Sequence, residues 1–153
     1  MTPHRARPLI AALATLPLVV SGCNPFAGPD PDVRVVISSA RFEFEEPVTF
    51  EVRNDLDRVV VLYACDGNPW VELLQHVDGE WTSVAAPDCA AIYSSDPIEL
   101  EPGDRVRGFH PGRHLRGLYG LSLPYTSYER RASGGFGVAT IGNAKSEPFH
   151  ITR

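Results

Sequence analysis

Beyond residue 32, apolar and polar residues alternate one by one along much of the chain. In the segment 48–53, Val48, Phe50 and Val52 are apolar and their neighbours are polar or charged, which is typical of a strand with one buried and one solvated face. No window of ten or more residues in this part of the sequence has apolar residues at helical spacing. Short strands with turn signals about every 8–12 residues indicate an antiparallel sandwich or barrel. The sequence therefore predicts an all-β fold.

Turn-forming dipeptides mark where the expected strands begin and end. Asp78-Gly79 lies between two β-rich runs and predicts a tight hairpin. Pro102-Gly103 and Pro111-Gly112 bracket one short strand. Residues 58–65 are apolar at both odd and even positions, so we expect a central strand that is covered on both faces. The predicted strands are 33–38, 48–53, 58–65, 71–77, 80–84, 98–100, 105–110, 115–123, 136–140 and 148–152.

The first 22 residues have the composition of an export signal. Arg5 and Arg7 precede an uncharged apolar run from Leu9 to Val20. The run has twelve residues, too few to cross a bilayer core, which needs about 20. A charged start, a short apolar stretch and small residues before a cleavage point indicate a secretory signal peptide. We predict a signal helix over residues 1–22 that is removed from the mature protein.

The end of this segment, Val20-Ser21-Gly22-Cys23, resembles the lipobox of bacterial lipoproteins. The resemblance implies cleavage before Cys23 and acyl chains, palmitate among them, on that residue, which anchor the protein to a membrane. It also implies a place in the bacterial cell envelope. Asn24 follows where an aspartate would imply inner-membrane retention, so the periplasmic face of the outer membrane is favoured in a cell with two membranes. The alternative is an ordinary signal peptide followed by a chance cysteine.

Residues 23–32 are expected to link the anchor to the domain. Three of the nine residues from Asn24 to Asp32 are prolines, which stiffen the segment and prevent regular strand pairing. Residues 33–153 are enough for one domain with one hydrophobic core. After cleavage the chain carries 19 acidic and 12 basic residues, a formal charge of about −7. This balance argues against a nucleic-acid partner, because such binding depends on neutralising phosphates.

The chain has two cysteines in addition to the proposed anchor residue Cys23, namely Cys65 and Cys89. In an oxidising compartment they are expected to form a disulfide bond with each other. Zinc binding is the alternative, but a closed zinc site needs about four ligands and the chain has no second cysteine pair. The spacing is not Cys-x-x-Cys, so we expect a structural role rather than a redox role.

The last predicted strand alternates so that Phe149 and Ile151 point inward. Four segments resemble parts of bacterial immunoglobulin-like sandwich domains: Val48–Asn54, Leu100–Asp104, Gly117–Tyr119 and Phe149–Ile151. The resemblance implies an immunoglobulin-like antiparallel β-sandwich. The cysteines depart from antibody-type domains, where the two cysteines are far apart in sequence, because Cys65 and Cys89 bracket a hairpin. Domains of this kind also occur as bacterial proteinase inhibitors.

Three groups of residues are candidates for binding. Arg105 and Arg107 share one face of a strand, with Arg113 or Arg116 expected nearby, and could bind carboxylates or other anions. We favour the alternative, a solvated face paired with some of the acidic residues. Trp70, beside the expected disulfide, is either a binding anchor or a cover for the edge of the core, and we favour the latter.

The stretch from Tyr125 to Gly135 is expected to be a polar loop rich in Tyr, Ser, Gly and Arg. Its Tyr128, Arg130 and Arg131 suit an adaptable binding loop, although ordinary sandwich loops look similar. The segment Glu129–Ser133 would serve as the bait if the domain were a protease inhibitor.

His110 and His114 lie across a tight turn and could share a metal ion if Asp104 or Glu101 supplied a third ligand. We favour solvated turn histidines instead. The sequence has no Gly-x-Ser-x-Gly motif and no phosphate-binding loop followed by a helix. We therefore predict a non-catalytic binding or structural module without a cofactor, whose partners are the membrane and another envelope protein. A protease inhibitor is the alternative, and a metal-binding protein or enzyme is favoured least.

Overall fold

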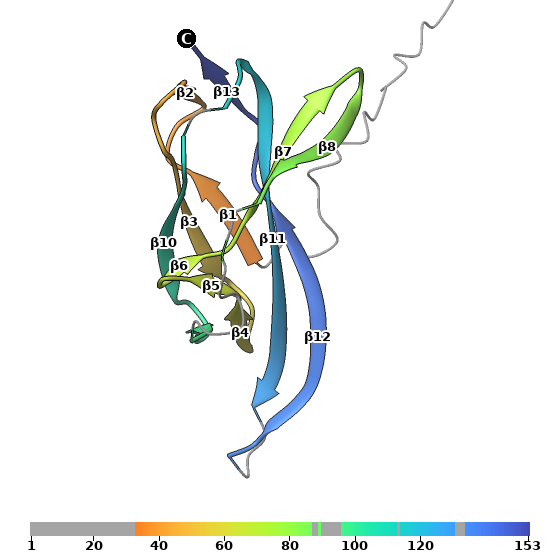
Figure 1. Cartoon of the computed structure of the whole chain (residues 1–153). Helices are drawn as coiled ribbons and strands as arrows, with labels where there is room; N and C mark the ends of the chain where they lie inside the picture. Colours follow the sequence, from red (N-terminus) through yellow and green to blue (C-terminus); the bar gives the residue numbers. More distant parts are fainter. Residues whose placement is uncertain (1–32, 87–88, 90–95, 113, 131–133) are drawn as a thin grey trace, which may run out of the picture.

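The computed structural model describes residues 33–86, 89, 96–112, 114–130 and 134–153, and Figure 1 shows their arrangement. These residues form strands and turns without any helix, as predicted. Within the described ranges, no helix has the length and apolarity of a membrane span. The predicted signal peptide over residues 1–22 and the predicted tether over residues 23–32 lie outside the described part of the chain.

The smaller of the two main sheets has three antiparallel strands in the order β1-β3-β10. Each strand alternates, so that one face turns into the core and the other faces solvent. The solvent face carries the charged residues of these strands together with Val36, Thr49 and Phe109. The strands are β1 (Val33–Ile37), β3 (Val48–Asn54) and β10 (Arg105–His110).

The larger sheet is organised around β11 (Gly117–Arg130), whose fourteen residues pair with four neighbours. The first half of β11 lies between β13 and β7, and the second half lies between β12 and β4. The other strands are β2 (Arg41–Glu43), β4 (Val59–Leu62), β7 (Glu72–Val77), β8 (Glu80–Ala85), β9 (Ile98–Leu100), β12 (Phe136–Lys145) and β13 (Phe149–Thr152).

The core lies between these two sheets, in the manner of a sandwich. Val48, Phe50 and Val52 of β3, all predicted to point inward, are at most 3% exposed. From the larger sheet, Leu121 and Leu123 of β11 are fully buried. These residues belong to one continuous apolar cluster. An all-β fold with sandwich-like sheets is therefore confirmed.

The predicted hairpin at Asp78-Gly79 is confirmed as the turn between β7 and β8, and both residues have positive φ. The predicted central strand over residues 58–65 is confirmed in its first half, because β4 lies between β11 and β9 and its Val59, Val60 and Leu62 are buried. Its second half was wrong: β4 ends at Leu62, and Ala64–Cys65 forms a separate short strand, β5.

The strand β5 pairs with β6 (Asn68–Pro69) in a two-stranded hairpin. The predicted disulfide between Cys65 and Cys89 is present, with the Cα atoms 5.9 Å apart. The Asn68 side chain fixes this hairpin to β10: its Nδ2 donates to the Phe109 carbonyl at 2.9 Å, and the Phe109 N–H donates to its Oδ1 at 2.9 Å. The Asn68 amide thus makes the two backbone hydrogen bonds to Phe109 that a neighbouring strand would otherwise make at this edge of β10.

The expectation of a loop from Tyr125 to Gly135 was wrong, because β11 continues as far as Arg130. Tyr125 and Ser127 still point inward and are each 1% exposed. A buried serine is tolerated here because its hydroxyl donates to the Thr140 carbonyl at 3.4 Å. The start of this strand was also misplaced, since Leu115 precedes it and is 75% exposed.

Candidate functional site

The outward face of the three-stranded sheet carries a row of arginines. The strand register places Arg34 of β1 opposite Arg53 of β3, and Arg53 opposite Arg105 of β10. The next row with the same orientation contains Glu51 and Arg107. Neighbouring strands are about 4.8 Å apart, so the guanidinium groups lie within reach of one another. We call Arg34, Arg53, Arg105 and Arg107 the arginine face.

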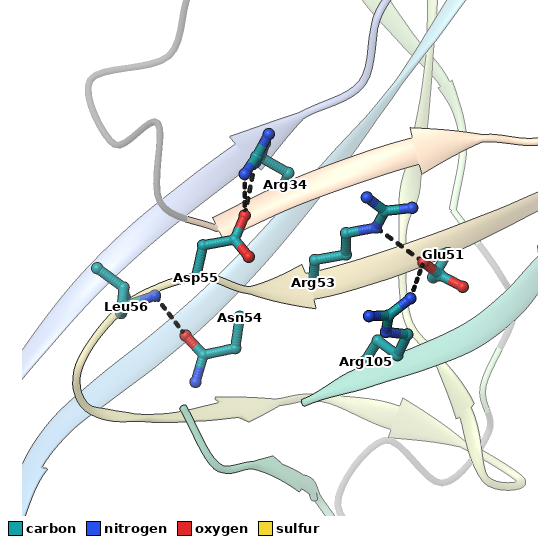
Figure 2. A network of polar contacts seen from close by, with 7 residues as sticks. All are labelled: Arg34, Glu51, Arg53, Asn54, Asp55, Leu56 and Arg105. Atoms are coloured by element: carbon teal, nitrogen blue, oxygen red, sulfur yellow. Dashed lines mark hydrogen bonds and ion pairs between the residues drawn. The ribbon is translucent and has the colours of Figure 1, made fainter. Parts of the chain in front are cut away.

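One carboxylate interacts with three of these arginines, of which Figure 2 shows Arg53 and Arg105. Glu51 Oε1 is 2.8 Å from Arg53 Nε and 3.9 Å from Arg105 Nη1, while its Oε2 is 3.6 Å from Arg107 Nε. The hydrogen bond from Arg53 lowers the pKa of Glu51 below its usual range, and the charges of Arg105 and Arg107 act in the same direction. Glu51 is therefore a carboxylate at neutral pH.

The fourth arginine, Arg34, pairs with Asp55 through a 2.7 Å hydrogen bond from its Nε. The arginine face thus has four positive charges against two negative ones, although the chain as a whole is acidic. The Arg105 and Arg107 side chains are 65% and 89% exposed, and that of Glu51 is 17% exposed. The carboxylate therefore lies beneath guanidinium groups that extend into solvent, where they can bind anions.

The sequence predicted part of this site. The favoured alternative, exposed arginines paired with acidic residues, is present in the pairs with Glu51 and Asp55. The shared orientation of Arg105 and Arg107 is confirmed by their register with Arg53 and Glu51. The expectation that Arg116 joins them was wrong, because Arg116 lies beside Arg41 and His150 on the larger sheet. Arg113 is outside the described residues. Arg34, Arg53 and Glu51 were missed: alternation indicates that each points outward, but only the strand register shows that they are neighbours.

The other candidate binding residues are spread over different elements. Trp70 is half-buried, and its backbone N–H donates to the Tyr63 carbonyl at 2.9 Å, a position at the edge of the core. Tyr128 packs its ring against Phe136 across the β11–β12 hairpin, with centroids 5.3 Å apart. Arg130 is the last residue of β11, and Arg131 lies outside the described residues. The protease-inhibitor alternative, which rests on Glu129–Ser133, stays a prediction.

His110 and His114 come together, as the sequence suggested, but not as two solvated residues. His110 is 3% exposed, and its Nδ1 is 3.2 Å from His114 Nε2. Both nitrogens also contact the Pro111 carbonyl, at 3.0 and 2.8 Å. The suggested third ligands are not there: the Asp104 carboxylate accepts a hydrogen bond from the Glu101 N–H instead. No group of three or more His, Cys, Asp and Glu suited to a metal occurs among the described residues.

Burial makes His110 a source of pH-dependent stability. Desolvation lowers the pKa of His110 from 6.5 to about 4, opposed by its contact with the Pro111 carbonyl. Between these two values the unfolded chain binds a proton that the folded chain does not. The free energy of unfolding should therefore fall by about 3 kcal/mol as the pH drops from 6.5 to 4. Urea unfolding at a series of pH values measures this slope. It should flatten in His110→Leu and persist in His150→Leu, whose histidine is exposed; an unchanged slope in His110→Leu would contradict the assignment.

The chain matches no protein-family model, and comparisons with curated proteins and with solved structures give no match either.

Proposed function

We propose that this protein is a lipid-anchored protein of the bacterial cell envelope, with an immunoglobulin-like β-sandwich that binds a carboxylate-rich segment of another envelope protein through the arginine face. The observation that carries the binding proposal is the alignment of Arg34, Arg53 and Arg105 across three neighbouring strands. Guanidinium groups bind carboxylates through paired hydrogen bonds, which gives both affinity and orientation.

Charge segregation supports an acidic partner. The chain has more acidic than basic residues, yet the arginine face has an excess of positive charge that its two carboxylates do not neutralise. Such a patch steers an acidic partner to one side of the molecule, while the acidic remainder repels it elsewhere. A membrane anchor would add to this by raising the effective concentration of the partners in one plane.

The immunoglobulin-like assignment is supported by Tyr119, near the start of β11. Its hydroxyl donates to the Leu115 carbonyl, four residues earlier, at 2.6 Å. A tyrosine that bonds back to the upstream backbone at the start of a long strand is a feature of immunoglobulin-like sandwiches. The segment Gly117–Tyr119, one of the four that resemble these domains, contains this residue.

The anchor is tested by metabolic labelling with a palmitate analogue. We expect label on the wild-type chain and none on Cys23→Ser, which should also leave the membrane fraction. Label that persists in Cys23→Ser, or a wild-type chain without label, would contradict lipid attachment at this residue.

Binding is tested with a hexaglutamate peptide as the probe and the full chain as the receptor. Replacing Arg105→Glu together with Arg107→Glu should weaken binding about tenfold or more, because two exposed attractive charges become repulsive. The matched control is Arg41→Glu with Arg116→Glu, which makes the same change in net charge on the larger sheet. Binding should also weaken with added salt. Equal losses in both double variants, or no binding by the wild type, would contradict the proposal.

A further inference from the structure

The strand β12 presents an edge and three exposed apolar side chains. Within the described residues, β11 is the only strand in ladder pairing with β12, and a single bridge joins Val35 to Ser146 just past its end. Phe136 is 51% exposed, Val138 72% and Ile141 85%. Figure 1 shows the β11–β12 hairpin extending beyond the other strands at one end of the molecule. The outer backbone edge of β12 is thus open to another strand.

This edge lacks the usual protection. Soluble proteins block exposed edges with charged residues, prolines or bulges. No charged residue and no proline occurs from Phe136 to Ala144. The one irregularity, a register shift opposite Tyr128 and Arg130, lies near the tip, and the ladder from Ala139 to Lys145 is regular. A segment without charge or proline leaves its backbone edge accessible to a further strand.

We propose that β12 pairs antiparallel with β12 of a second copy of this chain, to form a continuous ribbon in the order β11-β12-β12-β11. The segment suits itself as a partner, because its lack of charge avoids the repulsion that two acidic chains would otherwise experience. Antiparallel pairing of identical strands also has the two-fold symmetry of most protein dimers. Strand addition at an open edge supplies backbone hydrogen bonds, and side chains select the register.

The free part of the edge favours a register centred on Thr140. The bridge between Val35 and Ser146 lies just past the C-terminal end of β12, so the edge is free along the middle of the strand and toward the tip of the hairpin. Centred on Thr140, within the regular part of the ladder, the two-fold axis places Ile141 opposite Ala139 of the partner. A large side chain then meets a small one, and the two Thr140 residues face each other. Threonine pairs of this kind are favourable across strands.

Sedimentation velocity over a concentration series tests the association, using the full chain with Cys23→Ser so that no acyl chain contributes. We expect a dimer that is lost in Ile141→Lys, because the added charges meet across the axis. The matched control is Leu115→Lys, which changes a residue of similar exposure outside β12 and should remain dimeric. A monomeric parent chain, or a dimer that survives Ile141→Lys, would overturn the proposal.

Cysteine cross-linking tests the register in the same background, where the Cys65–Cys89 bond leaves no other free thiol. Directly opposed residues have Cα atoms about 4.5–5.5 Å apart, a distance that a disulfide can bridge. Thr140→Cys should therefore give a reducible covalent dimer under mild oxidation. Val138→Cys should not, because the two copies of residue 138 would be offset by about 13 Å along the strands. Cross-linking through residue 138 but not 140 would overturn this pairing.

Discussion

Replacing Asn54 with Asp is expected to lower the free energy of unfolding by about 4 kcal/mol, more than most single substitutions do. Asn54 is the last residue of β3 and is fully buried, at an inward position where the alternation of the strand would otherwise place an apolar residue. Its side chain Nδ2 lies 2.9 Å from the carbonyls of Arg58 and Leu100 and 3.1 Å from that of Glu101. Aspartate would put an oxygen in place of this donor.

The same residue joins two turns to the core. Its Oδ1 accepts the Leu56 N–H at 3.1 Å (Figure 2), which closes the turn that follows β3. Its backbone N–H donates to the Asp104 carbonyl at 3.0 Å, and its own carbonyl accepts the Gly103 N–H at 2.8 Å. Since every polar group of Asn54 has a partner inside the protein, a substitution leaves several buried groups unsatisfied at once.

Three measurements separate this explanation from a general effect of substitution. Asn54→Ala removes the same hydrogen bonds without adding a charge, so it should cost less than Asn54→Asp. The deficit of Asn54→Asp relative to the wild type should shrink as the pH falls toward about 4 and be smallest below that value, because burial raises the folded-state pKa of the new carboxyl above its unfolded value and a protonated carboxyl donates again. Ser83→Asp, which introduces the same charge at an exposed position of β8, should change stability by less than about 0.5 kcal/mol. Equal costs at residues 54 and 83 would contradict this account.

Local patterns were enough to predict most strands, the β7–β8 turn and the disulfide, because each depends on alternation, turn chemistry or the number of cysteines. They failed where long-range pairing decides the structure. The strand β2 has three residues, too few for alternation to be recognised, and it is fixed by parallel pairing with β13 at the other end of the chain. The extension of β11 to Arg130 was missed because Ser127 interrupts the apolar alternation in the sequence. The serine is nevertheless buried, since its hydroxyl donates to the Thr140 carbonyl.

The candidate site was likewise predicted only in those features that depend on local alternation. Alternation correctly placed Arg105 and Arg107 on one face, since this requires only that residues 105–110 form a strand. Alternation also indicates that Arg34 and Arg53 point outward. It does not indicate that β3 lies between β1 and β10, and this order is what turns separate arginines into one surface around Glu51. Topology therefore supplied what the sequence pattern lacked.

The second large effect is expected at the C-terminal strand, where Phe149→Ala should lower the free energy of unfolding by about 4 kcal/mol. Phe149 was predicted to point inward and is fully buried. Its ring meets Phe42 of β2 edge-on, with centroids 5.4 Å apart, and lies nearly parallel to Tyr119 of β11, with centroids 6.3 Å apart. Removing the ring leaves a cavity between three strands and ends both aromatic contacts.

Chemical denaturation with an unchanged m-value measures this loss and shows that the fold is retained. Phe149→Leu keeps most of the buried volume and should cost about 1.5 kcal/mol or less. His150→Ala, at the next and exposed position, should change stability by less than about 0.5 kcal/mol. A large loss at residue 149 with almost none at residue 150 is the signature of a strand with one face in the core. Equal losses at both positions would mean that β13 does not alternate between core and solvent.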